Sequence, residues 1–285
     1  MPPSSPLMRR LFGLRSQAMT VRPESDIASY ILGFSSHSEE QKSYTTTHLG
    51  RLVRTVEIVP KGKEADHILE MGAYMQITPA LKSICGYGTV RGCYLGPLGR
   101  VDEKVVHSAS GEVFRCEIDL FDAERDVYPY PDGAFQTVVC CELLEHLAND
   151  PMHLMAEVNR VLQTGGHFVL STPNIASLRS VAAVLHRAHP GLYQQFIRPK
   201  NGFADPRHAR EYTPDELWNL FEGSGFAVAL LETGPYGLKP AQDLSWVNEL
   251  LKQRGFSTDL RGETVHVVAR KSGPVKVRYP AWLYD

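Results

Sequence analysis

The strongest constraint on how this chain folds is an alternation of strand and helix patterns on either side of residues 141–147. An apolar run over residues 134–140 precedes this segment. An amphipathic helix pattern, the pair Gly165–Gly166 and a second apolar run that ends in Ser-Thr-Pro-Asn follow it. Strands that alternate with helices predict a parallel sheet with right-handed crossovers. The segment is therefore expected at the carboxyl end of a strand, the edge at which open α/β sheets bind ligands.

The segment itself, Cys-Glu-Leu-Leu-Glu-His-Leu, concentrates ionisable side chains. If the chain becomes helical after Cys141, then Glu142, Glu145 and His146 lie at positions i, i+3 and i+4 and share one face. Two carboxylates and an imidazole on one face at a sheet edge predict a ligand-binding site.

Composition limits the class of protein. The 285 residues suit one α/β domain of about 200 residues with additions at its ends. The formal net charge of −2, from 30 basic and 32 acidic residues, does not indicate a nucleic-acid-binding surface. No apolar run approaches the roughly 20 residues that span a bilayer, so no membrane partner is expected. The five cysteines form no CxxC pair, which favours buried free thiols in a reducing cytosol and a cytoplasmic protein.

Local patterns divide the chain into five parts. We expect a flexible tail over residues 1–23, a helical cap over 24–62, a main domain over 63–271 with a substrate lid at 173–212, and a C-terminal tail over 272–285. The last tail is rich in aromatic residues, which predicts that it docks on the body or on a second subunit and leaves a homodimer open.

The pattern of apolar residues and turn signals also predicts the elements of the main domain. Strands are expected over residues 67–72, 89–95, 113–118, 134–141, 167–171, 226–231 and 264–269. The stretch between the second and third strands, residues 96–112, is expected to be a loop. In the cap, a short helix is expected after Ser25, and a stronger helix is expected to follow Ser38 and to end before Pro60. Asp150 is a predicted N-cap whose helix ends at Gly165–Gly166, and Thr213 begins a capping box.

The order strand, ELLEHL, helix, GG, strand, TPN, with YPYPDGAF before it, resembles the class I S-adenosylmethionine (SAM) dependent methyltransferase domain. The likeness covers roughly residues 66–270 and is greatest to a subgroup associated with O-methylation of glycans and small molecules. It implies a Rossmann-like α/β sheet, mostly parallel with one antiparallel edge strand. It also implies SAM as the cofactor.

The same resemblance assigns cofactor-binding residues. In the family, the first strand ends in an acidic residue and a Gly-rich turn beneath the methionine part of SAM. Here the turn reads EMGAYMQ, in which Glu70 and Gly72 match and Tyr74 and Gln76 replace later glycines. The family's ribose-binding carboxylate is missing after the second strand, where Cys-Tyr-Leu stands. The full set assigned to the cofactor is Glu70, Gly72, Ala73, Tyr74, Asp119, Leu120 and Glu142, with Asp119 and Leu120 in the place that contacts adenine.

A metal site is predicted as well. The pattern ExxEH, followed by STPN and by H-x-x-E-aromatic-T, is similar to the small-RNA 3′-terminal 2′-O-methyltransferases, and a related ExxEH occurs in ubiquinone-pathway O-methyltransferases. The resemblance implies Mg²⁺ or Mn²⁺ held by Glu142, Glu145, His146 and His208. A bound cation would lower the pKa of an acceptor hydroxyl and orient two neighbouring oxygens. Without a metal, His146 or His208 is the expected general base.

These features predict a SAM-dependent O-methyltransferase that acts on a hydroxyl of a small molecule or sugar. Two alternatives remain open at this point. One is an RNA 2′-O-methyltransferase, which the ExxEH pattern suggests and the net charge does not. The other is a non-catalytic scaffold that has lost SAM binding, which Tyr74, Gln76 and the missing ribose-binding carboxylate suggest.

Overall fold

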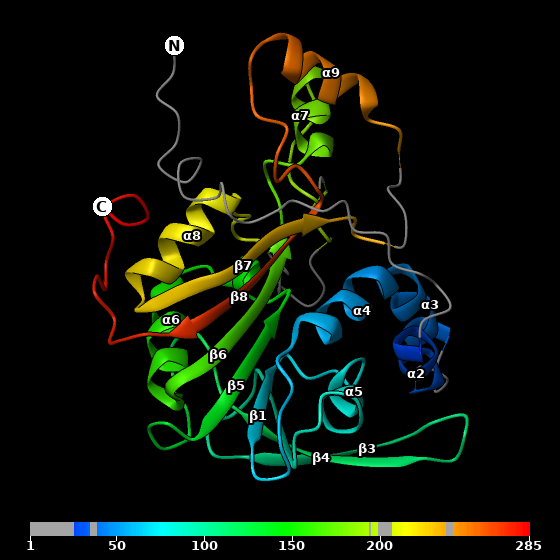
Figure 1. The fold of residues 1–285 in the computed structure, drawn as a ribbon, viewed down its shortest axis with the longest axis vertical. Helices are drawn as coiled ribbons and strands as arrows, with labels where there is room; N and C mark the ends of the chain where they lie inside the picture. Colours follow the sequence, from blue (N-terminus) through cyan, green and yellow to red (C-terminus); the bar gives the residue numbers. More distant parts are fainter. Residues whose placement is uncertain (1–25, 35–38, 194, 199–206, 238–241) are drawn as a thin grey trace.

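The computed structural model describes residues 26–34, 39–193, 195–198, 207–237 and 242–285, so the predicted tail over 1–23 lies outside it. The described residues form one sheet of eight strands in the order β3-β4-β2-β1-β5-β6-β8-β7 (Figure 1). The strands are β1 (His67–Met71), β2 (Thr89–Tyr94), β3 (Val101–His107), β4 (Val113–Leu120), β5 (Phe135–Cys141), β6 (Leu162–Pro173), β7 (Phe226–Gly234) and β8 (Thr264–Lys271).

The strand directions confirm the predicted fold class. Strands β1, β2, β4, β5 and β6 run parallel to one another, and β3 pairs antiparallel with β4 at one edge. A second antiparallel strand, β8, lies inside the sheet between β6 and β7. Strand β5 is apolar and buried along most of its length, as expected of a central strand covered on both faces.

Two local predictions were wrong. The expected loop over residues 96–112 contains strand β3, whose sequence Val-Asp-Glu-Lys-Val-Val-His is mostly exposed and charged, as edge strands commonly are. The helix after Asp150 ends at Val161, before the glycine pair, and Gly165 (φ +82°) lies inside β6 beside a register shift with β5. A side chain at Gly166 would meet the Gln136 carbonyl oxygen at 2.8 Å, so the glycine permits this close approach of two strands.

The cap is made of three helices, α2 (Asp26–Phe34), α3 (Glu39–Thr47) and α4 (Leu49–Ile58). The prediction of a single helix after Ser38 is wrong, because a turn at His48 separates α3 from α4. Ser38 itself lies outside the described residues. The predicted apolar face is buried: Leu52 and Val56 pack in one cluster with β-strand residues such as Val139. The cap therefore covers one face of the sheet.

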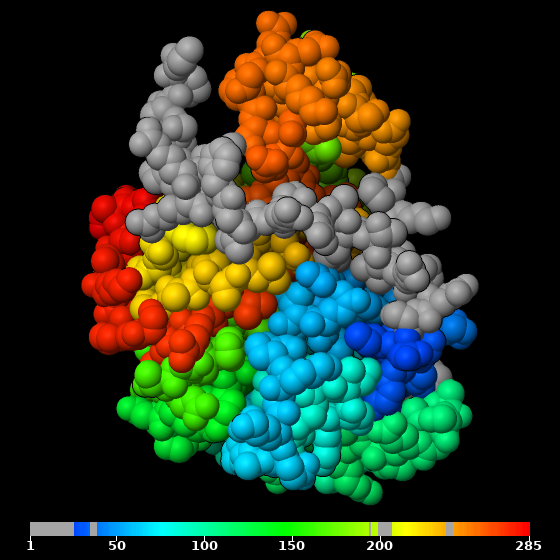
Figure 2. Space-filling view, viewed as in Figure 1, coloured from blue at the N-terminus to red at the C-terminus, as the bar shows by residue number. Residues whose placement is uncertain are grey.

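Helices on the opposite face and beyond the sheet edge complete the fold. Helix α5 (Thr78–Ser83) follows β1, α6 (Pro151–Val161) and α8 (Pro214–Gly223) cover the second face, and α7 (Leu178–Leu185) packs on α9 (Ser245–Gln253). In Figure 1 the pair α7 and α9 lies beyond the strand ends, and in Figure 2 the orange segment that contains α9 forms a projecting lobe. The division into cap, lid and tails stays a prediction.

Local capping and cysteine predictions are confirmed. Asp150 caps α6, and Thr213 and Glu216 form both bonds of the capping box. The five cysteines are free thiols, and four are buried. Among the described residues, we find no helix that combines the length and apolarity needed to cross a membrane.

Candidate active site

A hollow of about 210 Å³ lies at the carboxyl ends of the parallel strands, where the fold is expected to bind its ligand. Four chain segments line it. They are Met71–Gly72 after β1, Cys93–Leu95 after β2, Phe121–Glu124 after β4, and the turn after β5 that carries Leu143, His146 and Leu147. We call this hollow the cofactor cavity.

The glycine turn after β1 shapes the floor of the cofactor cavity. Gly72 has φ +70°, a conformation that glycine adopts without a steric cost, and its N–H donates to the Cys93 carbonyl at 2.8 Å. The bulky residues that replace the later glycines do not fill the cavity. The Tyr74 side chain is 65% exposed and lies parallel to the Tyr94 ring, and neither Tyr74 nor Gln76 lines the cavity. The presence of Tyr74 and Gln76 in place of glycines therefore does not block the cavity.

Four of the predicted cofactor residues are buried and do not line the cavity: Glu70, Ala73, Asp119 and Leu120. Glu70 is buried in β1, where burial raises the pKa of its carboxyl to about 7. Asp119 is buried and accepts hydrogen bonds from Arg91 and Tyr130, which tie β4 to its neighbours. Leu120 is a buried core residue. Ala73 is also buried.

The acidic side chains on the cavity wall are Asp122 and Glu124. Sequence reasoning missed them because β4 runs on through Leu120, so the ligand-facing segment begins at Phe121. The signal was present: the Asp-Leu-Phe-Asp run repeats an acidic residue three positions after Asp119.

The turn after β5 is not the helix that the spacing predicted. Glu142 has φ +53°, and only Leu144–His146 form a single 3₁₀ turn. Glu142 is consequently not grouped with Glu145, His146 and His208. Its carboxylate accepts from the Ser171 hydroxyl at 2.9 Å and lies 3.7 Å from the Arg51 guanidinium of the cap.

Arg51 was not predicted at all, and only the tertiary fold reveals it. Its side chain is 2% exposed, donates to the Tyr44 hydroxyl at 3.1 Å, and lies 5.5 Å from the Tyr236 ring. The negative charge of Glu142 balances the buried guanidinium, so an ion pair joins the cap to the turn after β5.

Three of the four predicted metal ligands do come together. One ligand atom each from Glu145, His146 and His208 lies within 4.8 Å of the other two. We call these residues the metal group. Glu145 is fully buried: its Oε2 accepts from the Thr172 hydroxyl at 2.9 Å, and its Oε1 lies 3.9 Å from Nε2 of His208. Among the described residues, Oε1 has no hydrogen-bond partner.

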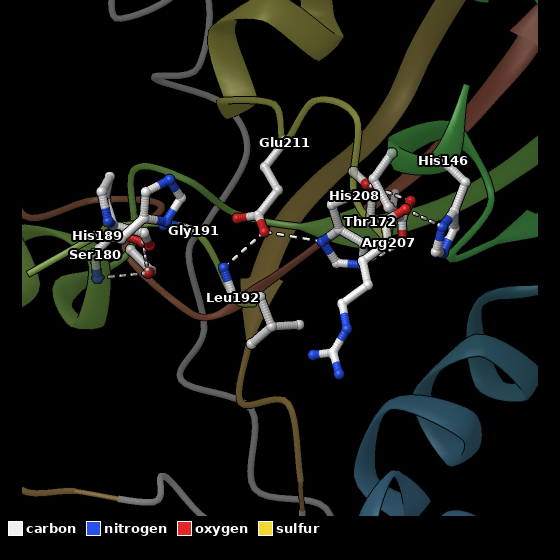
Figure 3. Close-up of polar contacts among 12 residues, drawn as sticks. His146, Thr172, Ser180, His189, Gly191, Leu192, Arg207, His208 and Glu211 are labelled. Carbon is white, nitrogen blue, oxygen red and sulfur yellow. Dashed lines mark hydrogen bonds and ion pairs between the residues drawn. The ribbon is translucent and has the colours of Figure 1, made fainter. Parts of the chain in front are cut away.

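Both imidazoles are oriented through Nδ1 (Figure 3). His146 Nδ1 lies 2.6 Å from the carbonyl oxygen of Arg207, which can only accept, so this nitrogen carries the proton. His208 Nδ1 lies 2.9 Å from the Glu211 carboxylate, which also accepts from the Leu192 N–H. In the neutral tautomers that make these bonds, the lone pairs are on Nε2, the nitrogen that binds a metal or takes a proton. Glu211 was within the quoted H-x-x-E pattern, but sequence reasoning gave it no role.

A second hollow, of about 300 Å³, lies beside His208 of the metal group. We call it the lid hollow, because its lining residues fall within the predicted lid over residues 173–212. Its lining includes Tyr193, Arg207, His208, Arg210 and Glu211. His146 lines the cofactor cavity and His208 lines this lid hollow, and their rings are 5.0 Å apart at 86°. The two histidines therefore stand between the two hollows.

Comparison with known proteins agrees with this architecture. A family model described as a methyltransferase domain matches residues 51–231. The chain belongs to the methyltransferase domain family. Among curated proteins, a probable S-adenosylmethionine-dependent methyltransferase of Mycolicibacterium smegmatis is 33% identical over 111 residues, which are 39% of this chain and 36% of that protein. The match thus spans about a third of the length of that relative.

Solved structures are similar in fold. A chain in a complex that contains the Haloferax volcanii Trm112 methyltransferase activator has a TM-score of 0.54 and 14% identity, over 89% of this chain and all of that one. A SAM-dependent methyltransferase from Archaeoglobus fulgidus has a TM-score of 0.50 and 15% identity, over 81% of this chain and 98% of that one. At the level of the family, the predicted methyltransferase domain is confirmed.

Proposed function

We propose that this protein is a SAM-dependent O-methyltransferase that acts on a hydroxyl of a small molecule or sugar, with a divalent cation held by the metal group. One observation carries the proposal. His146 borders the cofactor cavity and His208 borders the lid hollow, so the metal group stands where a donor in one hollow would meet an acceptor in the other.

The cofactor cavity suits SAM, which would supply an electrophilic methyl group. The glycine turn at Gly72 lets the backbone approach a ligand closely. Asp122 offers a carboxylate on the wall beside the end of β2, where the family's ribose-binding carboxylate is missing. Glu124 is less available for this role because Asn149 and Asp150 already donate to it.

The residues of the metal group suit Mg²⁺ or Mn²⁺. Oε1 of Glu145 is buried and has no hydrogen-bond partner within the described part of the chain, and it lies beside two imidazoles whose Nδ1 atoms are already engaged. These atoms are a donor set for such an ion. Burial raises the pKa of Glu145 well above its usual value, and the charge of Glu142 raises it further, so a cation would favour the ionised form. A bound cation would lower the pKa of an acceptor hydroxyl and orient two vicinal oxygens.

If the metal group holds no cation, the chain's own residues can move the proton instead, because the Nε2 lone pair of His208 cannot both bind a metal and accept a proton. Nε2 of His208 would take it from the acceptor hydroxyl, and the Glu211 carboxylate at Nδ1 would stabilise the resulting imidazolium. Aromatic side chains of the lid hollow, such as Tyr193, would then limit water around the acceptor.

The proposal is tested by methyl transfer from radiolabelled SAM to hydroxylated acceptors, including methyl glycosides and catechols, with dialysed protein and added Mg²⁺, Mn²⁺ or chelator. We expect metal-dependent transfer that falls about 100-fold or more in His208→Ala and Glu145→Ala. His186→Ala, an exposed histidine outside the metal group, is the matched control.

Binding measurements separate the parts of the proposal. Calorimetry with S-adenosylhomocysteine (SAH) should show that His208→Ala still binds the nucleoside. If the wild-type protein binds no SAH at millimolar concentration, the scaffold alternative replaces the enzyme. If it binds SAH but no metal, and both variants keep full activity, the metal group has no catalytic role.

A further inference from the structure

The chain after β8 is held against the body by its backbone. We call residues 272–285 the strap. The N–H groups of Ser272 and Gly273 donate to the Gly225 carbonyl at 2.9 and 3.1 Å, and those of Lys276 and Val277 donate to the Gly223 carbonyl at 2.9 and 3.1 Å. The strap therefore passes the end of α8 and then reaches the start of α6.

At the start of α6 the strap completes the helix cap. The first helical residue, Pro151, has no N–H to satisfy. The next N–H, of Met152, donates to the Tyr284 hydroxyl at 3.0 Å, and the third, of His153, donates to the Asp150 carboxylate at 3.2 Å. The Tyr284 hydroxyl in turn donates to Asp150. A residue of the strap thus satisfies a donor that the helix itself leaves unpaired.

Arg278 holds the same carboxylate. Its guanidinium donates to both oxygens of Asp150, the fork geometry that makes arginine–carboxylate pairs strong. Burial of Asp150 opposes ionisation, but the hydrogen bonds from Arg278 and Tyr284 outweigh it and lower the pKa of Asp150. The polar side-chain contacts of the strap's Arg278 and Tyr284 converge on Asp150.

The loop that ends at Asp150 is a wall of the cofactor cavity. It follows His146 directly, and its first residue, Leu147, lines the cavity. Glu124 accepts from the backbone of Asn149 and Asp150 and from the Asn149 amide, and Glu124 also lines the cavity. The loop is therefore fixed between a cavity residue and the strap.

We propose that Arg278 and Tyr284 are positioning residues for the cofactor cavity, which act through Asp150 to fix the loop over residues 147–150 against a bound nucleoside. The proposal rests on the proposed binding of SAM. Neither side chain touches the cavity, so their effect on the ligand is indirect. Leu283 and the Tyr284 ring pack on the core, whereas the polar contacts of Arg278 and Tyr284 lie at the start of α6, directly after the loop whose residue Leu147 lines the cavity.

The test measures SAH affinity by calorimetry at a temperature where circular dichroism shows every variant folded. Arg278→Ala should weaken SAH binding about 10-fold, because a displaced wall loses contacts with the ligand, and Tyr284→Phe should weaken it less. Arg278→Lys, which keeps the charge but not the fork, should lie between wild type and Arg278→Ala.

The control is Arg54→Ala, which breaks a two-bond arginine–carboxylate pair with Glu232 of comparable burial and a further bond to Glu57. None of these three residues lines the cavity. Arg54→Ala should lower the melting temperature by a similar amount and leave SAH affinity unchanged. Hydrogen exchange gives a readout without ligand: the amides of residues 147–149 should exchange faster in Arg278→Ala and not in Arg54→Ala.

The outcomes are distinguishable. If wild-type protein binds SAH but Arg278→Ala binds it equally well, the strap only stabilises the fold and this proposal is wrong, while the proposed function stands. If the wild-type protein binds no SAH, the proposed function fails and this proposal fails with it.

Discussion

The carboxyl of Glu70 gives a prediction whose size follows from its burial. Glu70 is 5% exposed in β1, and among the described residues its Oε2 has no hydrogen-bond partner. Burial raises its pKa from 4.5 to about 7. The shift of roughly 2.5 units corresponds to about 3 kcal/mol at about 1.4 kcal/mol per unit. The substitution Glu70→Gln removes the ionisable group and keeps the shape of the side chain.

The sign follows from the raised pKa. Below pH 4.5 the carboxyl is protonated in both states, so it contributes no pH dependence to stability. As the pH rises from 4.5 to 7, the Glu70 carboxyl ionises in the unfolded chain but stays protonated in the folded chain, so the wild type loses stability. Above pH 7 the loss is complete. Relative to the wild type, Glu70→Gln should therefore gain about 3 kcal/mol in free energy of unfolding between pH 4.5 and pH 8.

The measurement is urea unfolding of both proteins at several pH values, followed by circular dichroism. Burial of the glutamine amide changes the free energy of unfolding of Glu70→Gln by the same amount at every pH. The predicted quantity is therefore how much the difference in unfolding free energy between the two proteins changes from low to high pH. Glu103→Gln in the exposed edge strand is the control for replacing a glutamate by a glutamine. A flat difference for Glu70→Gln, or one that grows toward low pH, would refute the reasoning.

Four further substitutions test the fold and the cavity. A Cβ at Gly88 would lie 1.8 Å from the Glu64 carbonyl oxygen, so Gly88→Ala should cost about 3 kcal/mol of unfolding free energy or more. At Gly72 (φ +70°) a Cβ meets nothing within 4 Å, so Gly72→Ala should cost only about 1–2 kcal/mol in the same assay, and equal losses would contradict this. Thr213→Ala removes the capping box of α8 and should cost about 1 kcal/mol by urea unfolding; no loss would mean that the cap is dispensable. Tyr74→Ala should leave SAH affinity by calorimetry within about twofold, because the ring lies outside the cavity, and a large change would show that Tyr74 contacts the ligand.

Features that depend on short segments could be predicted from the sequence. The Thr213 capping box and the Asp150 cap each use side chains within three residues of the backbone groups they bind. The parallel sheet followed from apolar runs that alternate with amphipathic helices. His208 was placed with Glu145 and His146 because the resemblance supplied a long-range contact that no local pattern contains.

Features that depend on tertiary packing could not be predicted. Strand β3 has a charged and exposed sequence, and only its pairing with β4 makes it a strand. Glu142 has a left-handed backbone, so a helical spacing rule cannot place its side chain. Its partner Arg51 lies on a cap helix whose apolar spacing does not single it out, and its burial arises because α4 packs against the sheet.

The backbone, and not only the side chains, sets the geometry of the metal group. The N–H groups of Ala209 and Arg210 donate to the Glu145 carbonyl at 2.7 and 3.2 Å, which joins the end of the lid to the turn after β5. The Arg207 carbonyl, one residue before His208, accepts from His146. Because these main-chain contacts survive removal of the Glu145 carboxylate, Glu145→Ala should leave both histidines in place. A loss of metal binding in that variant would therefore report on the missing ligand, and not on a collapsed site.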